Sequence, residues 1–121
     1  DKKNMEKVFI EAAKAGVRAI SGINTIGMEV VDENNKPALG EDRKKSGICG
    51  YPIQTAALDF IKSANKINQD NKLGLELIGV GGITEAKHFN DFFNAGADVA
   101  MSATGMMWNT SLANNYHSLT K

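Results

Sequence analysis

The segment 78–83, with the sequence IGVGGI, ends an apolar run in two glycines, Gly81 and Gly82, directly before Thr84. Glycine lets backbone N–H groups approach an anion closely, because no Cβ stands in the way. A helix that begins near Thr84 adds the partial positive charge of its N-terminus at the same place. The pattern therefore predicts a phosphate-binding turn, although paired glycines also occur in tight turns that bind nothing.

A second segment, 102–105 with the sequence SATG, has similar chemistry one predicted strand later. It follows the apolar residues 99–101 and again places small residues and a hydroxyl just before a predicted helix. Phosphate sites of (β/α)8 barrels are often built from the loops after their last two strands. Two such loops on adjacent strands predict one shared phosphate site more strongly than either loop does alone.

Two further segments carry polar or reactive side chains. Asn24, in the segment 23–26 (INTI), offers two donors and one acceptor, so it can recognise an amide or a carbonyl, or else cap its own turn. Cys49 lies in the glycine-bracketed segment 46–50 (SGICG), and nothing adjacent in the sequence activates its thiol as a nucleophile. We interpret Cys49 as a small residue that lets a flat ligand approach. His88 and His117 are expected at the surface, without a catalytic role.

Hydrophobic periodicity predicts four helices around these segments. The apolar residues of the first follow helical i, i+3, i+4 spacing, and Gly16 suits its end. Pro52 suits the first turn of the second helix, where its missing N–H is not needed. Thr84 is expected to cap the third helix, and Gly96 to end it. The predicted helices cover about 5–13, 52–67, 84–95 and 105–119.

Short apolar runs between the helices predict strands at 17–20, 75–80 and 99–101, and a turn in the long segment before Pro52 predicts a hairpin between 28–31 and 36–39. Alternating strands and helices imply a parallel sheet with right-handed crossovers, in the α/β class. Three strands cannot close a barrel, and a (β/α)8 TIM barrel takes about 250 residues. The 121 residues are therefore interpreted as one partial domain: the C-terminal part of a TIM barrel, with about three strand–helix units after a first helix.

Composition argues against several other classes of protein. Hydrophobic residues make up 42% and charged residues 23%, as in ordinary globular domains, and the net charge of zero offers nothing to nucleic acid or anionic lipid. No apolar run approaches the roughly 20 residues that span a bilayer, and the first residues lack a secretion signal. A single cysteine allows no internal disulfide, and no metal-ligand spacing occurs, so no metal is expected. We expect a cytoplasmic protein.

In order along the chain, INTI (23–26), SGICGYP (46–52), IGVGGI (78–83) and AGAD with SAT (95–104) resemble the C-terminal half of dihydroorotate dehydrogenases. The resemblance covers about 17–108. It implies a non-covalent FMN across the mouth of the barrel and the oxidation of dihydroorotate to orotate, a step of pyrimidine biosynthesis, by hydride transfer to the flavin. The flavin half of dihydropyrimidine dehydrogenases is similar too, so the choice between dihydroorotate and a uracil-type substrate stays open.

The resemblance also implies roles by position. The family's catalytic base and a flavin-adjacent lysine belong to the N-terminal half, so no catalytic residue is expected in this chain, which alone is expected to be inactive. The expected partners are a small pyrimidine substrate, the N-terminal half of the barrel and a second copy in a homodimer, with neither nucleic acid nor membrane. The implied substrate-binding residues are Asn24 and Thr25, and the implied FMN-binding residues are Cys49, Gly50, Val80, Gly81, Gly82, Ala103 and Thr104.

Two other interpretations stay open on the sequence. A different phosphate-binding barrel enzyme would hold a sugar phosphate or a nucleotide in place of FMN. A non-catalytic fragment, acting as a scaffold, would bind neither flavin nor pyrimidine.

Overall fold

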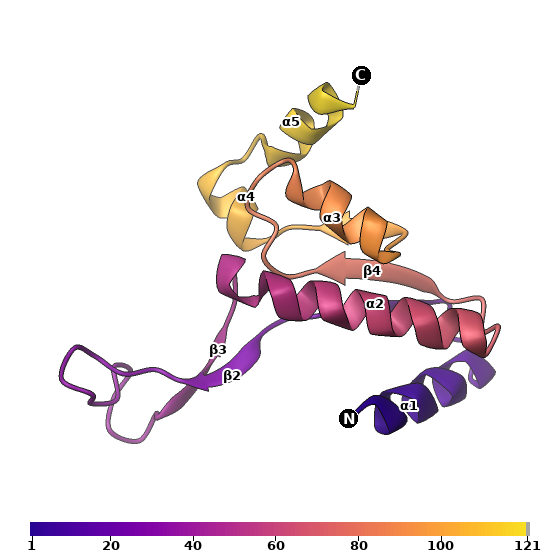
Figure 1. The fold of residues 1–121 in the computed structure, drawn as a ribbon. Helices are drawn as coiled ribbons and strands as arrows, with labels where there is room; N and C mark the ends of the chain where they lie inside the picture. The colour runs from indigo at the N-terminus through magenta and orange to yellow at the C-terminus, as the bar shows by residue number, and fades with distance from the viewer. Residues whose placement is uncertain (121) are drawn as a thin grey trace.

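The chain forms a three-stranded sheet with helices packed along it, in the computed structural model, which describes residues 1–120 (Figure 1). The sheet has the order β1 (Ala19–Gly22), β4 (Glu76–Val80), β5 (Val99–Met101), and both pairings are parallel. All three strands therefore present their carboxyl ends at the same edge. This arrangement confirms the predicted α/β class with parallel strands.

The helices are α1 (Lys2–Lys14), the 3-10 helix η1 (Tyr51–Ile53), α2 (Gln54–Asp70), α3 (His88–Ala95), α4 (Thr104–Trp108) and α5 (Leu112–Leu119). They alternate with the strands in the predicted order. Gly16 and Gly96 follow α1 and α3 with φ of 88° and 108°, a left-handed conformation that glycine adopts without steric cost. Among the described residues, no helix is both long and apolar enough to cross a bilayer.

A row of small residues brings the helices close to one face of the sheet. Gly22, Gly79 and Ala100 lie side by side in the strand register. A Cβ on Gly22 would collide with the ring of Phe60 from α2, and a Cβ on Gly79 would collide with the ring of Phe92 from α3. The missing side chains thus make room for two aromatic rings, which bury apolar surface between the helices and the sheet.

The opposite face of the sheet is open. Val99 and Met101 are 47% and 50% exposed, and the register places them beside the partly buried Ile78 and Val80. A sheet covered by helices on one face and open on the other is what a section of a barrel wall presents, because the open face lines the interior of the closed cylinder.

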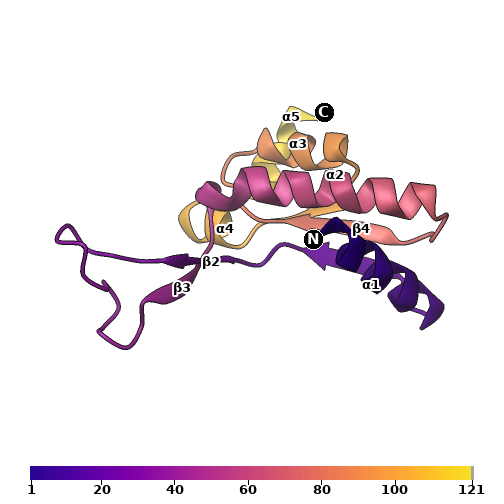
Figure 2. The ribbon, with the colours of Figure 1, turned by 60° about the horizontal axis from the view of Figure 1, so that its bottom comes forward.

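A hairpin between β1 and η1 extends away from the sheet and the helices (Figure 2). The predicted turn lies at its tip, but the predicted pairing is confirmed only beside that turn, because the strand β2 (Ile26–Glu29) pairs with β3 (Lys45–Ile48). The segment 36–39 contributes only an isolated bridge between Val31 and Pro37. Around this bridge the Asp32 N–H donates to the Lys36 carbonyl oxygen at 2.8 Å, and the Ala38 N–H donates to the Val30 carbonyl oxygen at 2.9 Å. The pairing predicted between 28–31 and 36–39 therefore forms only next to the turn.

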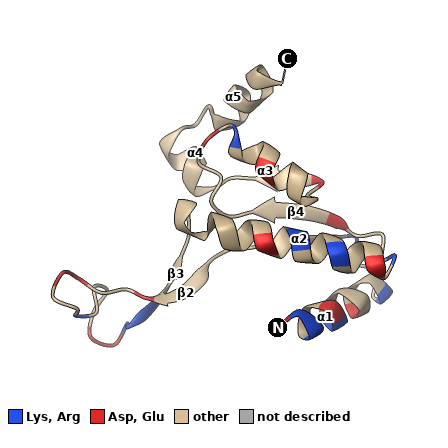
Figure 3. Ribbon diagram, in the orientation of Figure 1, with Lys and Arg blue, Asp and Glu red and all other residues tan. Residues whose placement is uncertain are grey.

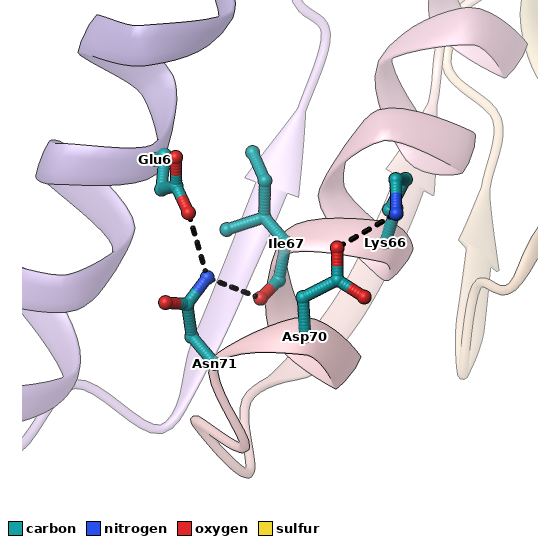
Figure 4. A network of polar contacts seen from close by, with 5 residues as sticks. All are labelled: Glu6, Lys66, Ile67, Asp70 and Asn71. Carbon is teal, nitrogen blue, oxygen red and sulfur yellow. Dashed lines mark hydrogen bonds and ion pairs between the residues drawn. The ribbon is translucent and has the colours of Figure 1, made fainter.

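Helix α1 is joined to the end of α2 by a polar network (Figure 4). Asn71 donates from Nδ2 to Glu6 Oε1 at 2.9 Å and to the carbonyl oxygen of Ile67 at 3.0 Å. Beside it, the hydrogen bond and the charge of Asp70, at 2.7 Å, raise the pKa of Lys66. A groove of about 380 Å³ lies between the two helices, and no residue at the carboxyl ends of the strands lines it.

The single helix predicted over 105–119 is divided into α4 and α5. Asn109 has φ of −135° and ψ of 91°, and its Oδ1 accepts a hydrogen bond from the Ser111 N–H at 3.1 Å. Such a side-chain turn replaces the backbone bonds that would continue the helix. The helical prediction over these residues is therefore correct only on either side of the break.

Candidate functional site

The carboxyl ends of β1, β4 and β5 and the end of β3 enclose one cavity of about 190 Å³. Every residue predicted for the substrate and FMN sites lines this cavity, so the structure brings all of them together. Ile83, Ser102 and Gly105 complete the lining; they belong to the segments predicted to bind phosphate, but no contact with a ligand was predicted for them individually. By origin, the lining residues are Asn24 and Thr25 after β1, Cys49 and Gly50 after β3, 80–83 at the end of β4, and 102–105 after β5.

Gly81 and Gly82 turn the chain sharply after β4. Their φ angles of 125° and 84° lie in the left-handed region that favours glycine. A Cβ on Gly82 would stand 2.6 Å from the Cβ of Gln54, the first residue of α2, and 2.8 Å from its backbone nitrogen. Gln54 also donates from Nε2 to the Gly82 carbonyl oxygen at 3.2 Å. The glycines therefore allow the start of α2 to pack directly against the turn and hold it in place.

The loop after β5 is tied to this turn. Ser102 donates from Oγ to the carbonyl oxygen of Ile83 at 2.6 Å, and a Cβ on Gly105 would collide with the same oxygen. The Ile83 side chain is buried in the core. The two loops therefore form one continuous border of the cavity. The sequence predicted that the two segments converge, but it did not predict the hydrogen bond that connects them.

Thr104 connects the loop after β5 to the loop that follows β3. Its Oγ1 donates to Cys49 Sγ at 3.5 Å, and its Cγ2 lies 3.3 Å from the place that a Cβ on Gly50 would take. Cys49 is an exposed, free thiol. Asn24 and Thr25 are exposed too, so their polar groups can be reached from solvent.

The cavity offers backbone groups rather than charged side chains to a ligand. No Asp, Glu, Lys or Arg lines it within the described part of the chain, and Figure 3 shows the charges on the hairpin, α1, α2 and α3 rather than on α4. Within residues 1–120, the N–H groups of Gly81, Gly82 and Ala103 donate to no other backbone group. Backbone N–H groups of such turns can bind phosphate, and a volume of about 190 Å³ is large enough for such a group, since a water takes about 30 Å³.

Two expectations about the segment after Gly82 are wrong. Helix α3 begins at His88 rather than near Thr84, so its N-terminus lies several residues beyond the glycine turn. His88, expected at the surface, is only 5% exposed. Its Nδ1 accepts hydrogen bonds from the N–H groups of Thr84 and Glu85 at 3.3 and 3.2 Å. The imidazole thus satisfies two backbone donors in the segment that precedes α3, and no hydrogen bond from the Thr84 side chain caps the helix.

Glu85 and Lys87 form an ion pair on the outside of the same segment, with Lys87 Nζ 2.8 Å from Glu85 Oε2. The hydrogen bond and the charge of Lys87 hold the pKa of Glu85 below its ordinary value, and Glu85 raises the pKa of Lys87 in the same way. Both side chains are largely exposed, so water screens the pair and it adds little to stability.

The chain matches known proteins along nearly its whole length. Residues 1–115 match the family model for dihydroorotate dehydrogenase. The chain belongs to the dihydroorotate dehydrogenase family. It is 48% identical over 122 residues to the dihydroorotate dehydrogenase of Dictyostelium discoideum, a match that covers all of this chain and 33% of that protein. It is 34% identical over 95 residues to dihydroorotate dehydrogenase A (fumarate) of Lactobacillus delbrueckii subsp. bulgaricus, over 74% of this chain and 29% of that protein.

The chain spans about a third of the length of the curated relatives it matches, and it corresponds to their C-terminal portion. The crystal structure of the enzyme from Eimeria tenella in complex with ferulenol matches it with a TM-score of 0.74, over 98% of this chain and 30% of that chain. At 16% sequence identity this likeness concerns the fold alone. It confirms the prediction that the chain is part of a TIM barrel.

Proposed function

We propose that the full-length protein is an FMN-dependent oxidoreductase that oxidises dihydroorotate to orotate. This chain supplies the FMN-phosphate site and part of the substrate site. The observation that carries the proposal is the single cavity at the carboxyl ends of β1, β4 and β5, where two glycine- and hydroxyl-bearing loops meet the segment with Asn24 and Thr25. Membership of the dihydroorotate dehydrogenase family supports the choice of reaction.

In this proposal the two linked loops hold the phosphate. The N–H groups of Gly81, Gly82 and Ala103 are free of backbone partners within residues 1–120, and they are the proposed donors to the phosphate oxygens. The Thr104 hydroxyl, which donates to Cys49 in this structure, adds a donor by rotating about its Cα–Cβ bond. Val80 precedes the turn and borders the same space. Because the strands and α2 fix these groups, little reordering accompanies binding.

Cys49 and Gly50 are proposed to border the flavin, and Asn24 and Thr25 the pyrimidine. Gly50 has φ of 78° and no side chain, so a flat ring can approach its backbone. Asn24 offers both amide donors and a carbonyl acceptor, which match the alternating N–H and C=O groups of a pyrimidine ring. Bound FMN supplies the acceptor for a hydride.

The residue that removes the other proton is proposed to lie elsewhere in the full-length protein. No carboxylate or imidazole lines the cavity within the described residues, and the partner of the Cys49 thiol is the Thr104 hydroxyl, which is no base at neutral pH. The chain alone is therefore proposed to bind parts of the ligands without turnover.

The test uses the purified full-length protein. We expect the absorbance of bound flavin, tighter binding of FMN than of riboflavin, and formation of orotate from dihydroorotate with an added electron acceptor. Turnover of dihydrouracil instead would indicate a uracil-type substrate, and a colourless protein that binds sugar phosphates would indicate another barrel enzyme. A ligand at a hundred times its dissociation constant adds about 2.7 kcal/mol of stability. Unchanged melting with FMN and with orotate would therefore contradict the proposal.

A further inference from the structure

We propose that His88 is a positioning residue for the cavity: its imidazole holds two of the bordering loops in register and thereby sets the affinity for the phosphate of the ligand. The inference rests on the proposed function, since it concerns the same phosphate site. His88 does not line the cavity itself, so any effect passes through the loops that it contacts.

The first contact is with the segment that continues the glycine turn. His88 Nδ1 accepts from the N–H groups of both Thr84 and Glu85, which directly follow Ile83 of the cavity lining. A ring nitrogen accepts only with a free lone pair, so these two hydrogen bonds use the lone pair of Nδ1. No side chain caps the N-terminus of α3. The first N–H groups of the helix bond to the carbonyl oxygens of 85–87, so the role of His88 is to hold the segment that precedes the helix.

The second contact is with the loop that follows β3. The ring of Tyr51 stacks on the ring of His88, with 5.5 Å between the centroids and 23° between the planes. Tyr51 directly follows Gly50, which lines the cavity, and its side chain is 58% exposed. Stacking on a fixed, buried ring is the contact that orients this exposed side chain, and through it the backbone of Gly50.

Through these two contacts, His88 connects two segments that border the cavity and that lie far apart in the sequence. It is the buried polar side chain of the described residues, at 5% exposure, and a buried polar group is costly unless it is hydrogen-bonded. Loss of the acceptor leaves two backbone donors unpaired, and the segment 83–85 then shifts until water can accept hydrogen bonds from them. This movement also displaces the N–H groups of Gly81 and Gly82, a few residues earlier, from the positions in which they bind the phosphate.

The test measures dissociation constants for FMN and for riboflavin, which lacks the phosphate, in the full-length protein. His88→Leu removes both the acceptor and the stacking ring. It is expected to weaken FMN binding about tenfold and riboflavin binding by less, so that the ratio of the two affinities falls. His88→Asn is expected to restore most of the FMN affinity, because Asn Oδ1 is as many bonds from Cα as His Nδ1. His117→Leu, at an exposed histidine of α5, is the matched control and should alter neither constant.

The outcomes separate the inference from the function on which it rests. Equal affinity of the unaltered protein for both flavins would overturn the proposed phosphate site, and His88 with it. If the unaltered protein prefers FMN and His88→Leu keeps the same ratio of FMN affinity to riboflavin affinity, only the role of His88 is overturned. If His88→Leu does not fold, the exposed partner decides: Tyr51→Ala should weaken FMN binding about two- to tenfold and Tyr51→Phe should not. No effect of Tyr51→Ala would then reject the inference.

Discussion

The Ser102 hydroxyl donates a hydrogen bond of 2.6 Å to the carbonyl oxygen of Ile83, and this bond joins the loop after β4 to the loop after β5. Ser102 is partly buried, and Ile83 is 1% exposed. Gly105 packs against the same carbonyl oxygen, which leaves little room for water to replace the hydroxyl. A buried acceptor that loses its donor costs about 1–3 kcal/mol.

Ser102→Ala in the full-length protein should therefore lower the free energy of unfolding by about 1–3 kcal/mol and weaken FMN binding, because the two loops are no longer connected. Urea denaturation and a fluorescence titration with FMN measure the two effects. Ser118→Ala is the control: Ser118 Oγ donates to the Asn114 carbonyl at 3.0 Å on an exposed helix surface, where water replaces the hydroxyl. If the two substitutions had equal effects, the Ser102 hydrogen bond would contribute no more than a hydrogen bond on an exposed helix surface.

Gly82→Ala tests the contact between the glycine turn and α2. Both Gly82 and Gly16 have left-handed φ, 84° and 88°, so a Cβ costs about 1–2 kcal/mol at either position. Only the Cβ at Gly82 also meets Gln54, at 2.6 Å, whereas nothing lies within 4 Å of a Cβ at Gly16. We expect Gly82→Ala to purify without flavin and Gly16→Ala to keep it, as judged by the ratio of flavin to protein absorbance. Full flavin occupancy in Gly82→Ala would remove the turn from the site.

The chemistry of the cavity was predictable from local sequence because parallel strands bring their carboxyl ends to one edge. Each segment needed only its own composition: the glycines at 81 and 82, the small and hydroxyl residues of 102–105, and the polar side chain of Asn24. The strand predicted at 99–101 has the bounds of β5, which Gly96 fixes on one side and the small residues on the other. Formation of the parallel sheet is then enough to bring these segments together.

The features that the sequence did not reveal depend on specific contacts, some within a few residues and some between distant segments. Helical periodicity placed His88 on a polar face, but stacking with Tyr51 and two backbone donors make its burial favourable. The hairpin pairs β2 with residues beyond 36–44, a register that no local pattern specifies. The break at Asn109 depends on a side-chain turn that competes closely with the helix, and composition alone does not decide between them.

Asn24→Ala tests the proposed substrate contact. Loss of the amide should weaken orotate binding about tenfold or more, while flavin content stays unchanged, because Asn24 follows β1 and is no part of the two phosphate loops. Calorimetric titration of the full-length protein with orotate measures the first quantity, and flavin absorbance measures the second. Asn34→Ala, at the exposed tip of the hairpin, is the matched control. Unchanged orotate affinity in Asn24→Ala would exclude the residue from the substrate site.

Cys49 provides a test that needs no substitution, because its thiol is exposed and borders the cavity. If FMN binds there, it should cover the thiol and slow alkylation by iodoacetamide, since only the free fraction of the protein reacts. At a hundred times the dissociation constant, about one molecule in a hundred is free, so alkylation of Cys49 slows up to about a hundredfold. Mass spectrometry of the peptide that contains Cys49 measures the rate in flavin-depleted full-length protein with and without FMN. Riboflavin at the same concentration should protect less, because it lacks the phosphate that the loops hold, and equal rates with and without FMN would place the flavin away from Cys49.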